Sequence, residues 1–155
     1  MRTFVLVSTL LLLVLRRTFI VVTVEGDSMR PTYPPGQRLL VRRCRTVTRG
    51  RVAVIAMPDP QVPGDPAWLV KRVAAVSGDP VPPQVYPTTD ATVPPRQLLL
   101  LGDNTRLSFD SRRIGYFPVT ALLGVVVYPL GTVTRYGSGV KQHTHGFDLG
   151  RVSMA

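Results

Sequence analysis

The sequence has few of the residues on which disulfides and metal sites depend. Cys44 is the single cysteine among 155 residues, which excludes an intramolecular disulfide and a cysteine-based metal site. Histidine occurs twice, as His143 and His145, in the polar segment KQHTHGFD. Two histidines at i and i+2 without an evident third ligand make a weak metal site. We therefore expect no metal and no cofactor.

The abundance of helix-breaking residues argues against a helical bundle. Fifteen prolines and thirteen glycines punctuate the apolar runs, and a proline inside a helix costs about 3 kcal/mol. Between them lie short segments rich in valine, leucine, isoleucine and threonine, a composition typical of strands. With 45% hydrophobic residues the chain can bury one core. We predict a mainly β fold with strands at 18–24, 38–43, 51–57, 68–76, 96–102 and 122–130.

Acidic residues are scarce. The chain has nine acidic residues and nineteen lysines and arginines, which gives a net charge of +10 and a pI of ≈ 11.0. Nucleic acid and anionic lipid are the usual partners of so basic a chain. The sequence lacks zinc-ligand spacing, an RNA-stacking aromatic pair and a recognition-helix pattern, so we expect no nucleic acid. We expect contact with anionic membrane lipid instead, and a merely solvated basic face is the alternative. Much of the charge lies at Arg38, Arg42, Arg43, Arg45, Arg49 and Arg51.

The N-terminal segment is apolar from Phe4 to Leu15, after which Arg16 and Arg17 interrupt it. This run is shorter than the roughly 20 residues that cross a bilayer. It could be a cleaved signal peptide, a helix buried in the domain, or a membrane anchor whose arginines reach the interface. Because no small-x-small cleavage site precedes residue 28, we predict an anchor over residues 1–17. The two arginines oppose the positive-inside tendency if the domain lies outside the cytoplasm, so topology stays open.

A β-rich core is expected over residues 18–136, and the polar residues 137–155 are expected to form a disordered tail. Both histidines lie in this tail. Nothing there would hold an imidazole beside a serine of the core, so we do not expect a histidine-based serine site.

The stretch VEGDSMRPT places Ser28 directly after an apolar strand, in a turn that Pro31 stiffens. A serine nucleophile needs a base, and Lys71 lies inside the apolar run WLVKRVAAV of a chain that otherwise uses arginine. Arginine stays protonated and cannot accept a proton. Burial, however, can lower the pKa of a lysine by up to about 3–5 units, so that its neutral amine could activate a serine. The alternative is a lysine that reaches solvent from a strand edge.

A third segment, GDNTRLSFDSR, follows the leucine run 98–101. A turn explains its first three residues. If the remainder is extended, alternation directs Ser108 and Asp110 to one face.

These segments, in the order GDSMRPT, VKRVAAVSGD and GDNTRLSFDSR, resemble the three signature boxes of type I signal peptidases. Those enzymes are membrane-anchored serine proteases with a serine–lysine dyad, and the resemblance covers residues 22–126. By motif position it implies that Ser28 is the nucleophile and Lys71 the general base. It implies that Ser108 orients the lysine amine, and that Asp110 and Arg112 form a charged pair that braces the loop.

The resemblance also implies an antiparallel β-sheet catalytic core of signal-peptidase type, here with a short N-terminal hydrophobic helix. Met29 would pack beside the site, and Gly102, Asp103 and Asn104 would shape the adjoining turn. Some members carry a serine at the position of Gly26, and its hydroxyl helps to bind the oxyanion. This chain, like other members, would rely on backbone N–H groups, first that of Ser28.

Larger members of the family insert a second β subdomain before the third signature box, which begins here with GDN and is called the GDN box below. Here the corresponding gap, residues 80–96, is short and proline-rich. It would therefore be a loop that replaces the subdomain.

The implied activity is cleavage of signal or leader peptides from secretory precursors after small residues, typically alanine at the first and third positions before the cut. The substrate would add as a strand to the edge of 19–24 or 68–70, against Val22, Val24, Leu69 and Val70. A single-pass anchor with an extracytoplasmic catalytic domain is the implied location. Two alternatives stay open: a maturation protease for one precursor, such as a nickel superoxide dismutase leader, and a non-catalytic membrane-associated binding module.

Overall fold

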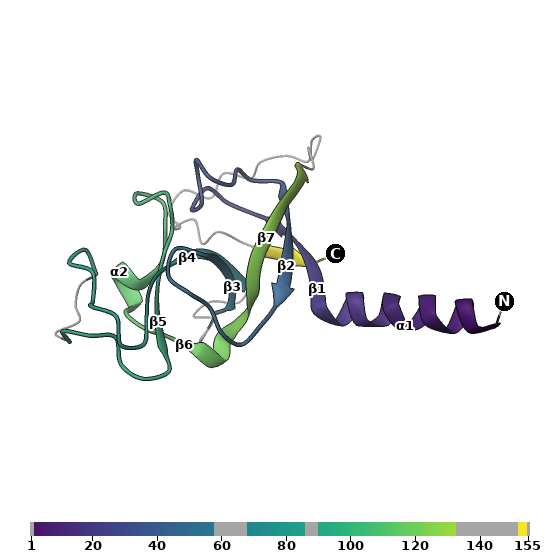
Figure 1. Cartoon of the computed structure of the whole chain (residues 1–155). Coiled ribbons are helices and arrows are strands. Elements are labelled where there is room, and N and C mark those ends of the chain that lie inside the picture. Colours follow the sequence, from purple (N-terminus) through teal and green to yellow (C-terminus); the bar gives the residue numbers. More distant parts are fainter. Residues whose placement is uncertain (1, 58–67, 86–89, 133–151, 155) are drawn as a thin grey trace.

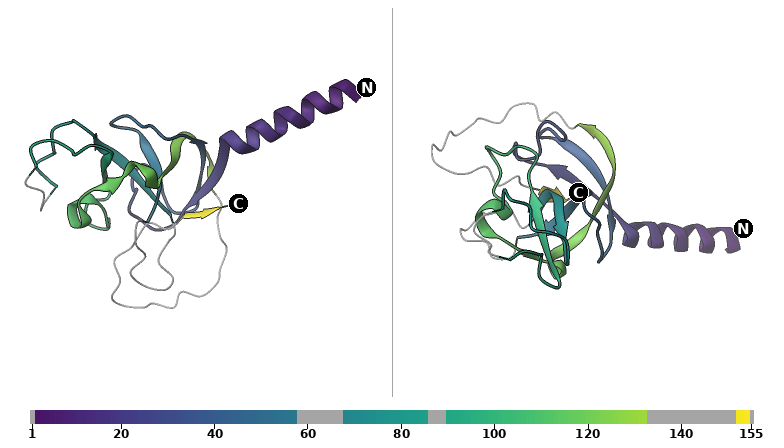
Figure 2. Two further views of the ribbon diagram at one scale, coloured as in Figure 1. Left: turned by 90° about the horizontal axis from the view of Figure 1, so that it is seen from below. Right: turned by 60° about the vertical axis from the view of Figure 1, so that its left-hand side comes forward.

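The computed structural model describes residues 2–57, 68–85, 90–132 and 152–154. Helix α1, Arg2–Thr18, leads directly into the first strand and projects away from the β-rich body (Figures 1 and 2). Its last turn carries Arg16 and Arg17. Within the described residues, no helix is both long enough and apolar enough to span a bilayer.

The body is one antiparallel sheet whose strand order is β6-β5-β4-β3-β7-β2-β1-β8. The prediction of a mainly antiparallel β fold with a short N-terminal helix is confirmed, and each apolar run predicted as a strand contributes one. A one-turn helix α2 (Ser111–Ile114) and a 3-10 turn (Val119–Ala121) precede β7. The strands are β1 Phe19–Val24, β2 Gln37–Arg43, β3 Val52–Ala56, β4 Trp68–Val76, β5 Gln97–Leu101, β6 Phe117–Pro118, β7 Leu122–Thr132 and β8 Val152–Met154.

The sheet curls, so that strands far apart in its order approach each other (Figure 2). Strands β3, β7 and β2 lie between β4 and β1 in the sheet. Val70 of β4 nevertheless belongs to the same buried cluster as Val22 and Val24 of β1. This curl brings the end of β1 and the middle of β4 to one place.

The proline-rich segment 80–96 packs against the body. Pro80 and Thr92 form an isolated β-bridge. Val85 and Val93 are buried with Leu99 of β5 in a small cluster of their own. Residues 86–89 lie outside the described part of the segment.

The interpretation of residues 137–155 as a disordered tail is wrong for Val152–Met154. These residues form β8 and pair antiparallel with β1. The edge of β1 opposite β2 offers main-chain donors and acceptors, and β8 satisfies them. The rest of the predicted tail, with His143 and His145, lies outside the described residues.

Candidate active site

Ser28 lies in a tight loop that returns the chain from β1 to β2. The N–H of Gly36 donates to the carbonyl of Val24 (2.8 Å), which closes the loop at its base. Inside it, the N–H of Arg30 donates to the carbonyl of Asp27 (3.1 Å), and the Arg30–Pro31 peptide is cis. Gly26 has a φ of 79°, in the left-handed region where a side chain is strained. The loop holds Ser28 with only 1% of its surface exposed.

Lys71 lies in the middle of β4 and is among the largest fully buried side chains of the described residues, with 0% exposure. Its partner across the β3–β4 ladder is Ala53. Because paired residues on antiparallel strands project to the same face, the small alanine leaves room for the lysine stem. The Lys71 Nζ then lies 2.8 Å from Ser28 Oγ, at hydrogen-bond distance. The sequence predicted Ser28 in a turn after one strand and Lys71 within another strand. The curl of the sheet brings the two side chains together.

The GDN turn after β5 is bonded directly to the Ser28 loop. The N–H of Asn104 donates to the carbonyl of Ser28 (2.9 Å), and its side-chain amide donates to the carbonyl of Asp27 (3.2 Å). Both bonds fix the main chain on either side of the serine. The segment that was expected only to shape a turn therefore also positions the serine loop.

Gly102 begins this turn at a point where no side chain fits. A Cβ built there would lie 2.1 Å from Ser108 Oγ and 2.7 Å from the carbonyl oxygen of Ser28. Ser108 is itself 5% exposed. Ser108 and Ser28 therefore approach Gly102 together, which places the hydroxyl of Ser108 beside the serine loop.

Asp110 and Arg112 form an ion pair that ties α2 to the end of β5. Arg112 Nε donates to Asp110 Oδ1 (3.0 Å), and a second guanidinium nitrogen contacts Oδ2. Asp110 also accepts from the N–H of Gly102 (2.8 Å) and caps α2 by accepting from the N–H of Arg112 (3.1 Å). The carboxylate, 0% exposed, thus holds the GDN turn against the helix.

A second ion pair was not predicted from the sequence. Arg72, next to Lys71, donates two hydrogen bonds to Asp103, from Nε to Oδ1 (2.8 Å) and from a terminal nitrogen to Oδ2 (2.7 Å). Thr32 of the serine loop also donates to this carboxylate. The sequence shows a charged residue next to Lys71 and another in the GDN box. It does not show that these two residues form an ion pair.

Both carboxyl groups have a lowered pKa. Burial raises the pKa of the Asp103 carboxyl, but hydrogen bonds from Arg72 and Thr32 and the charges of Arg72 and Lys71 hold it below the ordinary value. Burial likewise raises the pKa of Asp110. Hydrogen bonds from Arg112 and from the N–H of Gly102 more than offset this effect. The two acids therefore stay ionised, and each is held by an arginine.

The residues predicted to bind substrate are placed on two elements. Val22 and Val24 lie on β1, and Leu69 and Val70 lie on β4; all four are buried. Met29 is also fully buried and packs in the cluster that contains Val22 and Val24. The edge of β1 that was expected to be open is paired with β8.

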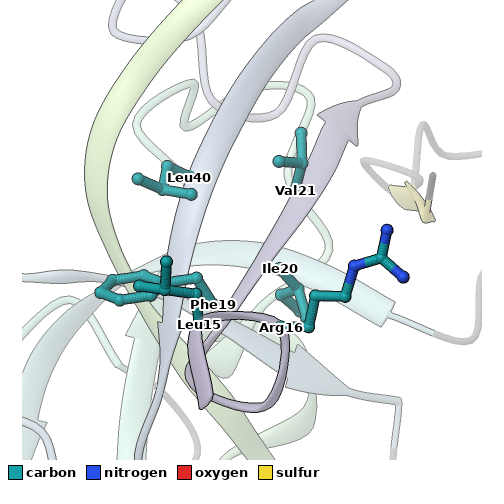
Figure 3. A pocket seen from close by; sticks show the side chains of 6 residues that line it. All are labelled: Leu15, Arg16, Phe19, Ile20, Val21 and Leu40. Atoms are coloured by element: carbon teal, nitrogen blue, oxygen red, sulfur yellow. The ribbon is translucent and has the colours of Figure 1, made fainter. Parts of the chain in front are cut away.

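A separate groove lies where α1 meets β1 (Figure 3). It has a volume of ≈ 520 Å³, and its lining is apolar except for Arg16. The other lining residues are Leu15, Phe19, Ile20, Val21 and Leu40.

Comparison with known proteins agrees with this arrangement. The sequence model of the family described as "Signal peptidase, peptidase S26" matches residues 1–84 and 82–130. A curated relative from Synechocystis sp., described as "Probable signal peptidase I-2", is 27% identical over 159 residues. The match covers 85% of this chain and 73% of the relative.

Proposed function

Because the chain belongs to the signal peptidase family, peptidase S26, we propose that it is a serine endopeptidase that removes N-terminal signal or leader peptides from secretory precursors. Cleavage follows small residues, of the Ala-x-Ala type, and proceeds through an acyl-enzyme on Ser28. The observation that supports this proposal most strongly is the 2.8 Å contact between Lys71 Nζ and Ser28 Oγ, since both residues are almost fully buried.

Burial of Lys71 favours the neutral amine, because removal from water penalises the charged form. The neutral amine accepts the proton of the Ser28 hydroxyl as Oγ attacks the scissile carbonyl carbon. The resulting ammonium returns the proton to the leaving amine, and the C–N bond breaks. Water activated by the same lysine then hydrolyses the ester and restores Ser28.

The remaining residues support this chemistry. Ser108 lies beside the serine loop and orients the lysine amine, while Asp110 and Arg112 fix the turn that carries it. With Gly26 before the serine, main-chain N–H groups stabilise the oxyanion, and that of Ser28 is the first donor. Loss of one such donor costs about 10²–10³ in rate, so the positions of these groups matter.

The substrate binds as an extended strand between the edges of β1 and β4. Its backbone pairs with the strand edges. Val22, Val24 and Val70 lie on one face of it and Leu69 lies on the other, and these apolar side chains leave room only for small substrate side chains. Strand addition of this kind obtains affinity from main-chain hydrogen bonds and specificity from the pockets for alternate side chains.

The decisive experiment is incubation of the purified protein with a labelled secretory precursor that has alanine at the first and third positions before the cut. The wild-type protein is expected to release the mature polypeptide, and Ser28→Ala and Lys71→Ala are expected to be inactive. Ser108→Ala should retain partial activity. Substantial cleavage by Ser28→Ala would refute the acyl-enzyme, and a wild-type rate for Ser108→Ala would refute its orienting role.

We further propose that α1 attaches the enzyme to a membrane that contains anionic lipid, with the catalytic body on the extracytoplasmic side. Phe4, Val7 and Leu10 of α1 are exposed and apolar. The groove of Figure 3 would receive lipid chains while Arg16 contacts phosphate. Flotation with vesicles rich in phosphatidylglycerol tests this: Leu10→Asp should abolish co-flotation, and equal flotation of variant and wild type would contradict it.

A further inference from the structure

Strand β8 occupies the edge of β1 that leads to Ser28. The register pairs Val22 with Met154, Thr23 with Ser153 and Val24 with Val152. β8 also lies against β4, the strand that carries Lys71. A segment more than a hundred residues away in sequence thus lies between β1 and β4, beside β1 in Figure 1.

This is the position assigned to the substrate strand under the proposed function, and the following inference rests on that assignment. Each main-chain N–H and C=O on the edge of β1 can pair with one neighbouring strand at a time. A substrate strand on Val22–Val24 and β8 on the same residues therefore exclude each other.

The direction of β8 shows which role it can play. β1 runs toward Ser28. A substrate that pairs with β1 through the residues before its cut site must therefore run parallel to β1, because only then does its scissile bond reach Ser28. β8 is antiparallel to β1. It enters the edge beside Val24 and runs away from Ser28, so residues 152–154 are not presented as the residues that precede a cut.

We propose that Val152–Met154 is an intramolecular blocking strand that competes with the substrate for the edge of β1 and must leave before a precursor binds. It is a competitor and not a substrate, because its direction is reversed. As part of the same chain, its effective concentration is set by the connection to β7 and not by the concentration of protein. Three of its residues are paired in the described part of the chain, so a longer substrate strand can displace it.

A proline in the blocking strand tests this in the full chain. Ser153→Pro removes a main-chain donor and constrains φ, which weakens edge pairing, whereas Ser153→Thr keeps a residue that suits a strand and serves as the matched control. With a fluorogenic peptide that carries alanine at the first and third positions before the cut, Ser153→Pro should lower KM about fivefold and leave kcat unchanged. Ser153→Thr should behave as wild type. Equal KM values for Ser153→Pro and wild type would overturn the proposal.

A second readout does not depend on activity. Amide hydrogen exchange at the residues of β1 that face β8, within Val22–Val24, should be faster in Ser153→Pro than in wild type. Exchange in β3 should be the same in both and reports that the variant is folded.

A competition experiment returns to the activity. A synthetic peptide of residues 150–155 added to Ser153→Pro should raise KM back toward the wild-type value.

The two ways of failing are distinguishable. If no variant cleaves peptide but exchange at β1 still differs, the proposed function fails and the blocking strand stands as a structural contact. If peptide is cleaved in a Ser28-dependent manner but KM or β1 exchange is the same in wild type and Ser153→Pro, the blocking strand fails and the peptidase stands.

Discussion

Arg72 and Asp103 form a bidentate ion pair beside the buried amine of Lys71, with donor–acceptor distances of 2.8 and 2.7 Å. Asp103 lies close enough to Lys71 for the two groups to interact electrostatically. An unpaired carboxylate there would favour the ammonium form of the lysine and oppose its action as a base. Because Arg72 neutralises the carboxylate, the pair fixes the GDN turn with little stabilisation of that ammonium.

The first prediction removes this neutralisation. In Arg72→Met the carboxylate of Asp103 loses its partner, so the ammonium of Lys71 gains stability and a higher pH is needed for the neutral amine. The acidic limb of the pH–rate profile for kcat/KM should therefore move to higher pH, with activity at neutral pH reduced about tenfold. Arg106→Met, which removes an exposed arginine of the neighbouring loop, is the control. An equal displacement in both variants would point to net charge and away from the ion pair.

The second prediction concerns Gly102, where a Cβ would collide with Ser108 and with the main chain of Ser28. Gly102→Ala should displace the serine loop and lower stability by about 1–3 kcal/mol, the usual cost of overpacking. Urea unfolding and peptide cleavage measure the two effects. Gly131→Ala adds the same methyl where nothing lies within 4 Å and should alter neither. Unchanged cleavage by Gly102→Ala would show that the loop tolerates the displacement.

The strands could be predicted because their short apolar runs are bounded by proline and glycine, and both signals are local. The contact between Ser28 and Lys71 is not local. Ser28 follows β1 and Lys71 lies on β4, and three other strands separate β1 from β4 in the sheet, so only the curl of the sheet brings them together. Resemblance to a known family indicated the pair, and nothing in the spacing of the residues did.

Two features were missed for different physical reasons. Arg72 was not assigned a partner because a charged residue on a strand next to Lys71 looks like a solvent-facing one in sequence. β8 was missed because three residues, Val152–Met154, are too few to show an alternating pattern. Its formation depends on the free edge of β1, which is a property of the folded sheet.

The third prediction is a pH dependence of stability at Asp110. The folded pKa of this carboxyl lies below its ordinary value, so it stabilises the fold fully above the unfolded pKa of about 3.9 and ceases to do so as pH falls through the folded pKa. At pH 7, Asp110→Asn should lose on the order of 2 kcal/mol, less than for a fully buried pair because Arg112 is partly exposed. Urea unfolding from pH 7 down to pH 2 should show the difference from wild type shrinking toward acid. A difference that stays constant with pH would mean that the charge of Asp110 contributes nothing.

The fourth prediction separates the two hydrogen bonds of Asn104. Asn104→Ala keeps the main-chain bond to the carbonyl of Ser28 and loses the side-chain bond to the carbonyl of Asp27. The residue next to the nucleophile is then held from one side only, and small misplacements of a reacting group are costly. We expect kcat to fall about tenfold, KM to change little, and stability to fall by about 1 kcal/mol. Steady-state cleavage of the alanine-containing peptide measures the first two and urea unfolding the third. Thr105→Ala, at the exposed neighbouring position, should resemble wild type in all three. A rise in KM with unchanged kcat would instead assign Asn104 to substrate binding, since a positioning residue acts through Ser28 and affects the chemical step.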